Sequence, residues 1–409
     1  MPGFLVGHAT HPDWKSALAM AALQIEAGRA AHEASAAGPL SLGFVYFTDH
    51  YAAHAAPLLE ALRERWPGLS WVGSVGVGVA AGGVEYIDEP ALVLMLADLP
   101  PGRFELFSGA RKLQGDQAFS ALVHADPATP ELAELIAELA DRTESGYLFG
   151  GLAASRGAVV HIADGVWQGG LSGVAFSREV ALVSRVTQGC QPFGPTREVT
   201  GCERNIVTRL DGQPALGCLL QDLGLDNLDD PRQAMPKLRA TLVGLTDAKD
   251  MALSRGGQFG AATRVRHLIG LDPAREAVAL ADILEPGMRL AFCHRDVQNA
   301  RRDLVRICSE IRDELDSQSE NSLAAASQPG GAGAAAPMPS LAVQQVLGAI
   351  YVSCSGRGGP HFGGPSAELK IVQHALGDVP LVGFFAAGEI ARHHLYGYTG
   401  VLTVFSGQA

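Results

Sequence analysis

The sequence lacks the marks of several common protein classes. Its six cysteines form no CxxC pair, so a structural zinc site is not expected. Without a secretory signal we expect these thiols to be reduced and mostly buried. The cysteines are Cys190, Cys202, Cys218, Cys293, Cys308 and Cys354. No run of about 18 apolar residues is present, which argues against a membrane-spanning helix. The first residues, MPGFLVGHATHPDW, predict no signal peptide, and we expect a cytoplasmic protein.

Positive charge is also scarce. The formal net charge is −12, and a protein that binds nucleic acid through its backbone needs a basic face, so nucleic acid is not an expected partner. Charged residues make up only 18% of the chain, whereas 47% of residues are hydrophobic and 49 are glycine. This balance is typical of a strand-rich globular protein with many tight backbone positions. A chain of 409 residues has room for two or three domains.

A similar order of segments occurs three times along the chain. Each copy runs strand, helix, apolar strand with a glycine, loop and strand, and the apolar strands read WVGSVGVGV, YLFGGLAAS and VPLVGFFAAGE. The intervals from the first strand to the marker glycine are 29, 29 and 33 residues: Phe44 to Gly73, Ala121 to Gly150, and Ile350 to Gly383. We therefore predict an α/β (α+β) fold of mixed sheets covered by helices, built from repeated β-α-β-β units in two related domains. The alternative is that any α/β protein yields such segments.

The segment between the second and third copies is different. It predicts a three-strand meander over TRVRHLIGLDPAREAVALADILEPGMRLAFCHRD, followed by the helix VQNARRDLVRICSEIRDELD. A domain boundary is expected near Pro195, giving domains 1–196 and 197–409. Residues 317–340 are rich in Ala, Gly, Ser and Pro, and we predict a flexible insertion there.

The motifs of several large enzyme classes are missing. Gly76, Gly78 and Gly82 give GxGxxxG, but β-branched residues follow them where a dinucleotide loop would open a helix. No GxxxxGK[ST], HExxH or GxSxG is present. No metal-binding residues are predicted.

The segment YVSCSGRGGPHFGG is the richest local group of reactive side chains. Cys354 ends a predicted strand, and Arg357 follows in a loop whose glycines suit an anionic group such as a carboxylate. His361 lies four residues further on, so a Cys/His nucleophile pair is one interpretation. The other is structural, with Arg357 capping a turn or pairing with Glu389.

The stretch VPLVGFFAAGEIA places Glu389 after two glycines, Gly383 and Gly388. Glycines leave the backbone uncovered, so a ligand or a neighbouring strand can approach it closely. Glu389 and Arg357 at one edge of a sheet would suit a zwitterion, with Glu389 for the ammonium and Arg357 for the carboxylate. The alternative is that Arg357 and Glu389 satisfy each other as a structural ion pair.

These motifs resemble the FIST family of sensory domains. VPLVGFFAAGEIA is similar to the closing signature of the family, YVSCSGRG to its Cys-x-Gly-Arg-Gly element, and the meander with Arg295 and Asp296 to its C-terminal domain. The N-terminal half departs from the pattern, because Ser74 stands where the family usually has cysteine and Gly78-Val79 replaces its Gly-Glu pair. The resemblance covers the chain except residues 317–340, and identifies 1–196 as the FIST N-terminal and 197–409 as the FIST C-terminal domain.

The resemblance implies a non-enzymatic sensory protein that binds a small ligand, with amino acids or related metabolites as candidates. A stand-alone sensor would signal through a separate protein such as a histidine kinase. The cofactor is unknown, and two alternatives stay open: a haem-binding nitric-oxide sensor, and an enzyme that uses Cys354 as nucleophile. The candidate ligand-binding residues are Cys354, Ser355, Gly356, Arg357, Gly383, Gly388, Glu389, Gly73, Ser74 and Arg295.

Overall fold

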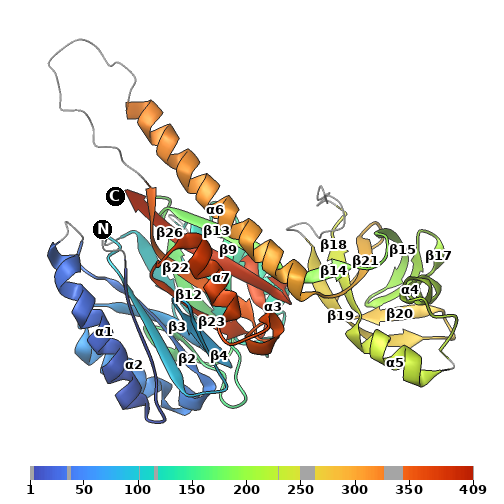
Figure 1. The fold of residues 1–409 in the computed structure, drawn as a ribbon, viewed down its shortest axis with the longest axis horizontal. Helices are drawn as coiled ribbons and strands as arrows, with labels where there is room; N and C mark the ends of the chain where they lie inside the picture. The colour runs from blue at the N-terminus through green and yellow to red at the C-terminus, as the bar shows by residue number, and fades with distance from the viewer. Residues whose placement is uncertain are drawn as a thin grey trace. The chain divides into compact units, whose positions relative to one another are not determined.

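The protein divides into two compact units (Figure 1). The structure is a computed structural model that describes residues 4–34, 38–100, 102–114, 118–228, 230–248, 263–326 and 344–408. Unit 1 comprises Met1–Val186, Leu304–Leu395 and Thr399–Ala409, and unit 2 comprises Thr187–Asp303 and Tyr396–Tyr398. No helix in these described ranges is long and apolar enough to cross a membrane.

The three predicted copies are present, and all of them contribute to unit 1. The first contains β2 (Leu42–Thr48), η1 (Asp49–His54), α2 (Ala55–Arg65), β3 (Ser70–Gly76), β4 (Gly78–Ala81), β5 (Val84–Ile87) and β6 (Ala91–Ala97). The second contains β8 (Ser120–Ala125), α3 (Leu132–Asp141), β9 (Tyr147–Leu152), β10 (His161–Ala163), β11 (Val166–Trp167) and β12 (Leu171–Phe176). The third contains β22 (Gln344–Cys354), η2 (Gly359–Phe362), α7 (Ala367–Leu376), β23 (Leu381–Ala386), β24 (Glu389–Arg392), β25 (His394–Tyr396) and β26 (Thr399–Gln408).

Each copy forms the centre of one mixed six-stranded sheet. Sheet 1 has the order β1-β6-β2-β3-β10-β11, sheet 2 the order β7-β12-β8-β9-β24-β25, and sheet 3 the order β13-β26-β22-β23-β4-β5. The three additional strands are β1 (Leu5–Thr10), β7 (Phe104–Phe107) and β13 (Leu182–Gln188). The first two strands of each copy are parallel, and their other neighbours with a determined register are antiparallel. The predicted mixed α/β fold is therefore confirmed.

The copies exchange their hairpins. The hairpin β4–β5 of the first copy completes sheet 3, β10–β11 of the second completes sheet 1, and β24–β25 of the third completes sheet 2. Each sheet thus ends in a hairpin from another copy, which links the three sheets in a ring.

The marker glycines of the repeat occupy one equivalent position. Gly73, Gly150 and Gly383 lie opposite Val45, Val123 and Tyr351 in the parallel strand pairs. A Cβ atom on these glycines would lie 1.7, 2.0 and 1.8 Å from the carbonyl oxygens of those partners. No side chain fits at that distance, so the close approach of the two backbones requires glycine.

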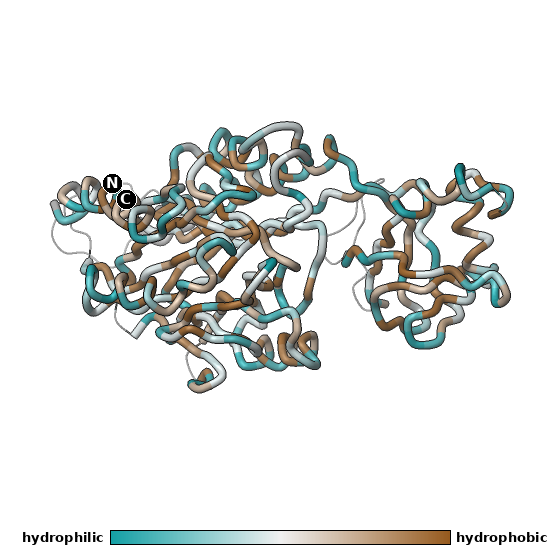
Figure 2. The backbone as a smooth tube through the Cα atoms, turned by 90° about the horizontal axis from the view of Figure 1, so that it is seen from below, coloured by the Kyte–Doolittle hydropathy of each residue, from teal (hydrophilic) through white to brown (hydrophobic). Residues whose placement is uncertain are grey.

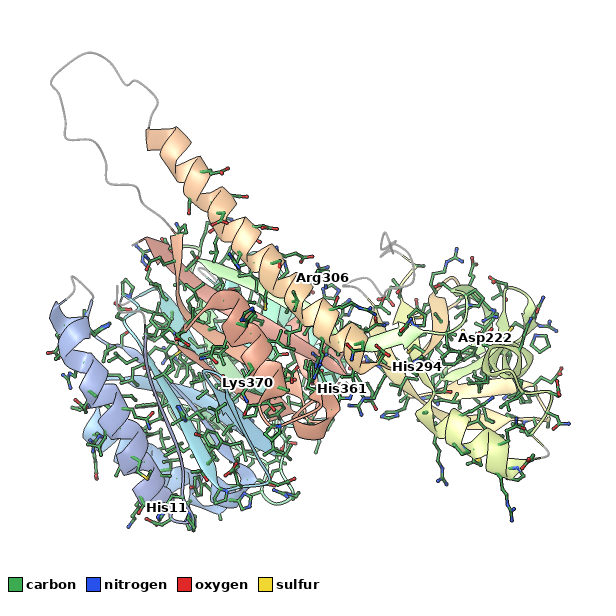
Figure 3. All side chains as sticks on the ribbon, in the orientation of Figure 1. His11, Asp222, His294, Arg306, His361 and Lys370 are labelled. Carbon is green, nitrogen blue, oxygen red and sulfur yellow. The ribbon has the colours of Figure 1, made fainter. Side chains whose placement is uncertain are left out.

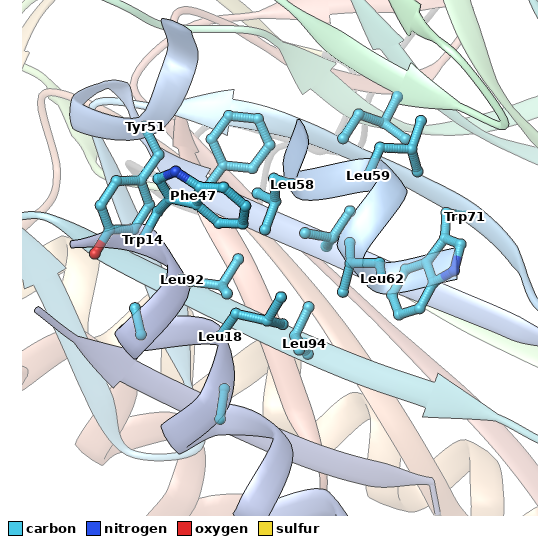
Figure 4. Packing of buried hydrophobic residues seen from close by; sticks show 14 of the residues in the cluster. Trp14, Leu18, Phe47, Tyr51, Leu58, Leu59, Leu62, Trp71, Leu92 and Leu94 are labelled. Carbon is cyan, nitrogen blue, oxygen red and sulfur yellow. The ribbon is translucent and has the colours of Figure 1, made fainter. Parts of the chain in front are cut away.

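Helices cover the outer faces of the sheets, and aromatic side chains fill the space between them. Residues of α1 (Trp14–Ala34) and α2 pack on sheet 1 in a large apolar cluster (Figure 4). Inside, rings from different sheets meet: the ring centroids of Tyr46 and Phe384 are 5.0 Å apart, and those of Phe176 and Phe405 are 5.5 Å apart. Figure 2 shows hydrophobic stretches of backbone (brown) crossing the interior, while hydrophilic stretches (teal) lie mostly at the periphery.

Unit 2 has a different, antiparallel architecture. Its elements are β14 (Cys190–Pro192), β15 (Arg197–Glu203), β16 (Ile206–Leu210), β17 (Gln213–Pro214), α4 (Ala215–Leu223), α5 (Pro231–Ala240), β18 (Leu242–Thr246), β19 (Arg264–Asp272), β20 (Ala277–Leu280) and β21 (Arg289–Arg295). The predicted meander is β19, β20 and β21. Because β18 pairs with both β19 and β21, the order β18-β21-β15-β16-β20-β19 returns to β18 and closes the sheet on itself.

The structure corrects the predicted insertion. Helix α6 (Val297–Ala326) continues through residues 317–326, so the insertion does not begin at Ser317. The serines and alanines of that stretch tolerate a helix well once the preceding turns have started it. Residues 327–340 lie outside the described residues. The predicted domain boundary at 196/197 stays a prediction, because the compact units follow contacts rather than chain order.

Candidate functional site

Arg357 follows β22 in the chain, is buried, and forms an ion pair with Glu368 of α7. Its side chain is 1% exposed, and its Nε and Nη2 atoms each lie 2.9 Å from Oε1 of Glu368. Its guanidinium carbon also lies 5.1 Å from the centre of the Phe362 ring. Burial by itself would lower the pKa of Arg357, but Glu368 raises it above its ordinary value. The ion-pair partner of Arg357 is therefore Glu368, and not Glu389. In Figure 3 the labelled residues His361 of η2 and Lys370 of α7 mark the two elements that follow Arg357 in the chain.

Glu368 gathers further donors into what we name the Arg357 network: Arg357, Glu368, Tyr351 and Ser353. Tyr351 OH donates to Oε1 at 2.6 Å, and Ser353 Oγ donates to Oε2 at 3.0 Å. Burial and the Glu368 charge raise the pKa of Tyr351, so its hydroxyl keeps its proton. All four side chains are buried. The network fixes α7 to sheet 3.

Glu389 begins β24 and faces a second group of polar atoms. Its side chain is 0% exposed, and its Oε2 accepts hydrogen bonds from Thr399 N at 3.1 Å and Thr399 Oγ1 at 2.7 Å. Burial raises the pKa of Glu389 to about 8; hydrogen bonds from Thr399 and Cys354 and the charge of Arg357 lower it in part. At neutral pH the carboxyl is mostly protonated. Arg357 therefore influences Glu389 through its charge, while Cys354 and Thr399 contact it.

Most of the remaining predicted positions in the third copy act through their backbone. The Ser355 N–H donates to Ala386 O at 2.9 Å, and Ser355 itself is exposed. Gly356 is half-buried, and the Gly388 carbonyl accepts from Leu152 N at 2.8 Å. Ser355 thus connects the end of β22 to the end of β23, and Gly388 connects the start of β24 to β9.

Ser74, predicted from the N-terminal half, lies opposite a histidine that the sequence reasoning missed. His161 of β10 pairs in register with Ser74 of β3. Its Nε2 lies 3.2 Å from the carbonyl oxygen of Gly169, and its Nδ1 lies 2.5 Å from Ser172 Oγ. A carbonyl oxygen only accepts, so Nε2 carries the proton and Ser172 donates to Nδ1. Burial lowers the pKa of His161, which keeps the ring neutral.

A second missed histidine lies at the centre of unit 1. His124 of β8 is 0% exposed, its Nε2 is 3.2 Å from Tyr46 OH, and its ring contacts those of Tyr46 and Phe384. Its Nδ1 has no hydrogen-bond partner among the described residues. Burial lowers the pKa of His124 to about 3, so the ring is neutral.

These side chains form two rows at one level of the fold. Across sheet 1, Tyr46 pairs with Ser74 and Ser74 with His161. Across sheet 2, Ser172 pairs with His124, His124 with Gly151, and Gly151 with Glu389. We name the six polar residues the central belt, and each is at most 1% exposed: Tyr46, Ser74, His124, His161, Ser172 and Glu389.

A comparison of the three copies shows which residues of the central belt are equivalent. Counted from the marker glycines, His124 is equivalent to Tyr46 and Val352, and Glu389 is equivalent to His161 and Val79. The third sheet therefore contributes apolar residues where the other two contribute polar ones. The repeat was visible in the sequence. The exchanged hairpins add His161 beside Ser74, and Glu389 to the row of His124, and their register was not visible in the sequence.

Arg295 belongs to unit 2, whereas the other predicted residues belong to unit 1. Its side chain is exposed, and its guanidinium carbon lies 5.4 Å from the centre of the Tyr398 ring. In the described ranges, no group of three or more His, Cys, Asp or Glu side chains could hold a metal ion.

Two family models match the chain. The FIST N domain matches residues 41–213, and the FIST C domain matches residues 215–392. Together they span most of the protein, which therefore belongs to the FIST family, whose domains are sensory domains of signal transduction.

Mycobacterial proteins resemble it over nearly their full length. The chain is 29% identical over 418 residues to the "Uncharacterized protein Rv0628c" of Mycobacterium tuberculosis, with 98% of each chain covered. It is also 29% identical over 420 residues to the "Uncharacterized protein Mb0898c" of Mycobacterium bovis, again with 98% of each covered.

Proposed function

We propose that this protein is a cytoplasmic sensor without catalytic activity, and that it binds a small ligand such as an amino acid or a related metabolite in the central belt. The belt is the observation that supports this. Burying a polar group costs free energy unless a partner satisfies it. Six polar side chains are buried at one level, and His124 Nδ1 has no hydrogen-bond partner among the described residues. A small polar ligand would supply the missing hydrogen bonds.

Four of the predicted ligand-binding residues have a role in this proposal: Glu389, Cys354, Ser74 and Arg357. Glu389 would receive the amino group of the ligand and become ionised, because an ammonium group offsets the burial that now raises its pKa. Cys354 and Ser74 would border the same space. Arg357 would stay with Glu368 and assist through its charge, since leaving that partner would strand a buried carboxylate.

Access to the central belt requires a movement, because Glu389 is 0% and Cys354 only 9% exposed. The hairpin β24–β25 carries Glu389 and forms the edge of sheet 2, so it is the element that would open. A ligand that holds this hairpin in a new position would change the surface of unit 1. A separate signalling protein, such as a histidine kinase, would detect that change.

The test is a thermal-shift screen of the full chain with the common amino acids. A ligand at 100 times its Kd stabilises a protein by about 2.7 kcal/mol, so a true ligand raises Tm by several degrees. We expect the shift to be lost in Glu389→Gln and kept in Glu179→Gln, which alters an exposed glutamate paired with Arg103. No shift with any amino acid would contradict the ligand class, and a shift that survives Glu389→Gln would contradict the site.

The two alternatives give different signals in the same preparation. A Soret band that develops on addition of haem would favour the haem-dependent sensor. Rapid alkylation by iodoacetamide at neutral pH, absent in Cys354→Ser, would favour the enzyme. We expect slow alkylation, because the Cys354 thiol is buried and donates its hydrogen to Glu389.

A further inference from the structure

Unit 1 also contains an open pocket that shares no residue with the central belt. It lies where the first residues of β8 and β9 face β13, β26 and α6, and its volume is about 270 Å³. Pockets for drug-sized ligands begin at about 300 Å³, so this one suits a smaller molecule. Its apolar lining includes Phe119, Phe149 and Leu182, which suit the hydrophobic body of a small molecule.

Hydroxyl groups supply the polar part of the lining. Ser120 is 5% exposed, and its Oγ has no hydrogen-bond partner among the described residues. Ser184 Oγ and Thr403 Oγ1 lie 2.8 Å apart, and Tyr147 borders the same space. Burial raises the pKa of Tyr147, so its phenol stays protonated. A buried hydroxyl without a partner costs free energy, and a ligand oxygen placed beside Ser120 would recover it.

The charged groups of the pocket are already neutralised. Arg185 Nη2 lies 2.6 Å from Glu314 Oε2, and Arg185 Nε lies 3.2 Å from Glu310 Oε2. Arg392 acts on Tyr147 through its charge, which brings the local sum to two positive and two negative groups. A charged ligand would have to lose its hydration and disturb these pairs, whereas an uncharged one would not.

We infer that this pocket binds a small uncharged molecule with an aromatic or alicyclic body and one or two hydroxyl or carbonyl groups. The apolar lining holds the body, and Ser120 and Tyr147 bind the oxygen atoms. The site is independent of the proposed amino-acid site, since Glu389 does not line it.

Three probes with the same phenyl body test the inference on the full chain: 2-phenylethanol, 2-phenylethylamine and 3-phenylpropionate. Calorimetric titration should show 2-phenylethanol binding about tenfold or more tightly than either charged probe. Ser120→Ala and Tyr147→Phe should each weaken 2-phenylethanol several-fold. Ser177→Ala, a buried serine outside the pocket, should leave it unchanged, and the Tm of each variant confirms folding.

Several results would overturn the inference. These are no binding of 2-phenylethanol, equal or tighter binding of a charged probe, and equal losses in Ser120→Ala and Ser177→Ala. Glu389→Gln separates the two proposals, because it should abolish amino-acid binding and leave 2-phenylethanol binding unchanged. Loss of 2-phenylethanol binding in that variant would place the alcohol in the central belt and contradict the assignment.

Discussion

At the scale of single residues, the fold keeps a proton on Glu389. Its pKa is about 8 in the folded protein, against 4.5 for the ordinary side chain, because burial penalises the carboxylate. The folded state therefore binds this proton more tightly than the unfolded state. The corresponding stability is fully present below pH 4.5 and is lost as the pH rises through about 8.

Replacing Glu389 by glutamine should remove this pH dependence. Glutamine has the shape of the protonated acid, and its oxygen can still accept from Thr399. The stability of Glu389→Gln relative to the wild type should rise by up to about 1.4 kcal/mol per pH unit between pH 5 and 8 and then level off. Urea denaturation at a series of pH values measures it. A difference that stays flat over this range would mean that Glu389 is ionised in the fold.

At the scale of elements, two of the exchanged hairpins accept hydrogen bonds from parts of another copy. Glu85 of β5, from the first copy, accepts from the N–H groups of Glu368, Leu369 and Gly359 at 3.0, 3.1 and 3.3 Å, two of them at the start of α7. Asp164, between β10 and β11, accepts from Trp71 N at 2.8 Å. The first turn of a helix has N–H groups without acceptors in the helix. The Glu85 carboxylate, from a distant part of the chain, provides the acceptor for two of them in α7.

Glu85→Ala should therefore loosen a helix that lies more than 280 positions away along the sequence. Losing the acceptor leaves buried N–H groups unsatisfied, which costs about 1–3 kcal/mol. Hydrogen exchange should show faster exchange at the start of α7, while α2 keeps its protection. As control, Glu64→Ala alters an exposed glutamate of α2 and should change stability by less than about 0.5 kcal/mol. Unchanged exchange in α7 would show that Glu85 is not its cap.

Elements and their neighbours differ in how well the sequence predicts them. The three copies were predictable because glycine at Gly73, Gly150 and Gly383 is required by a local contact between consecutive strands. The exchange of hairpins was not, because strands of two to four residues, such as β11 and β24, carry too little pattern to specify a distant partner. Cys354 and Glu389 were expected near each other because both belong to the third copy, whereas His161 and the Arg357–Glu368 pair were not predicted.

At the scale of the whole molecule, the ring of sheets should make unit 1 unfold as one body. All four tryptophans lie in sheet 1, on a helix that covers it, or directly after such a helix: Trp71 and Trp167, Trp14, and Trp66. Their fluorescence reports on sheet 1, whereas the Arg357 network lies on sheet 3. A perturbation of the network reaches the tryptophans only if the sheets unfold together.

Glu368→Gln provides this perturbation. It leaves the Arg357 charge buried without its partner carboxylate, which should destabilise the protein by about 3–5 kcal/mol. The urea midpoint of tryptophan fluorescence should shift by as much as that of far-UV circular dichroism. Lys370→Ala, at an exposed position of the same helix, should shift neither. A shift in dichroism without one in fluorescence would show that sheet 3 unfolds independently.

The hairpin exchange has a consequence for a severed chain. If the backbone were cut after β6, between the first and second copies, the two pieces would still be joined by strand pairing. Hairpin β10–β11 of the second piece would still pair in sheet 1, and hairpin β4–β5 of the first piece would still pair in sheet 3. The association of the copies thus depends more on strand pairing between them than on the peptide chain that connects them. Halves of the gene expressed separately could reassemble into a working particle, which offers a route to splitting this sensor into a reporter of protein proximity.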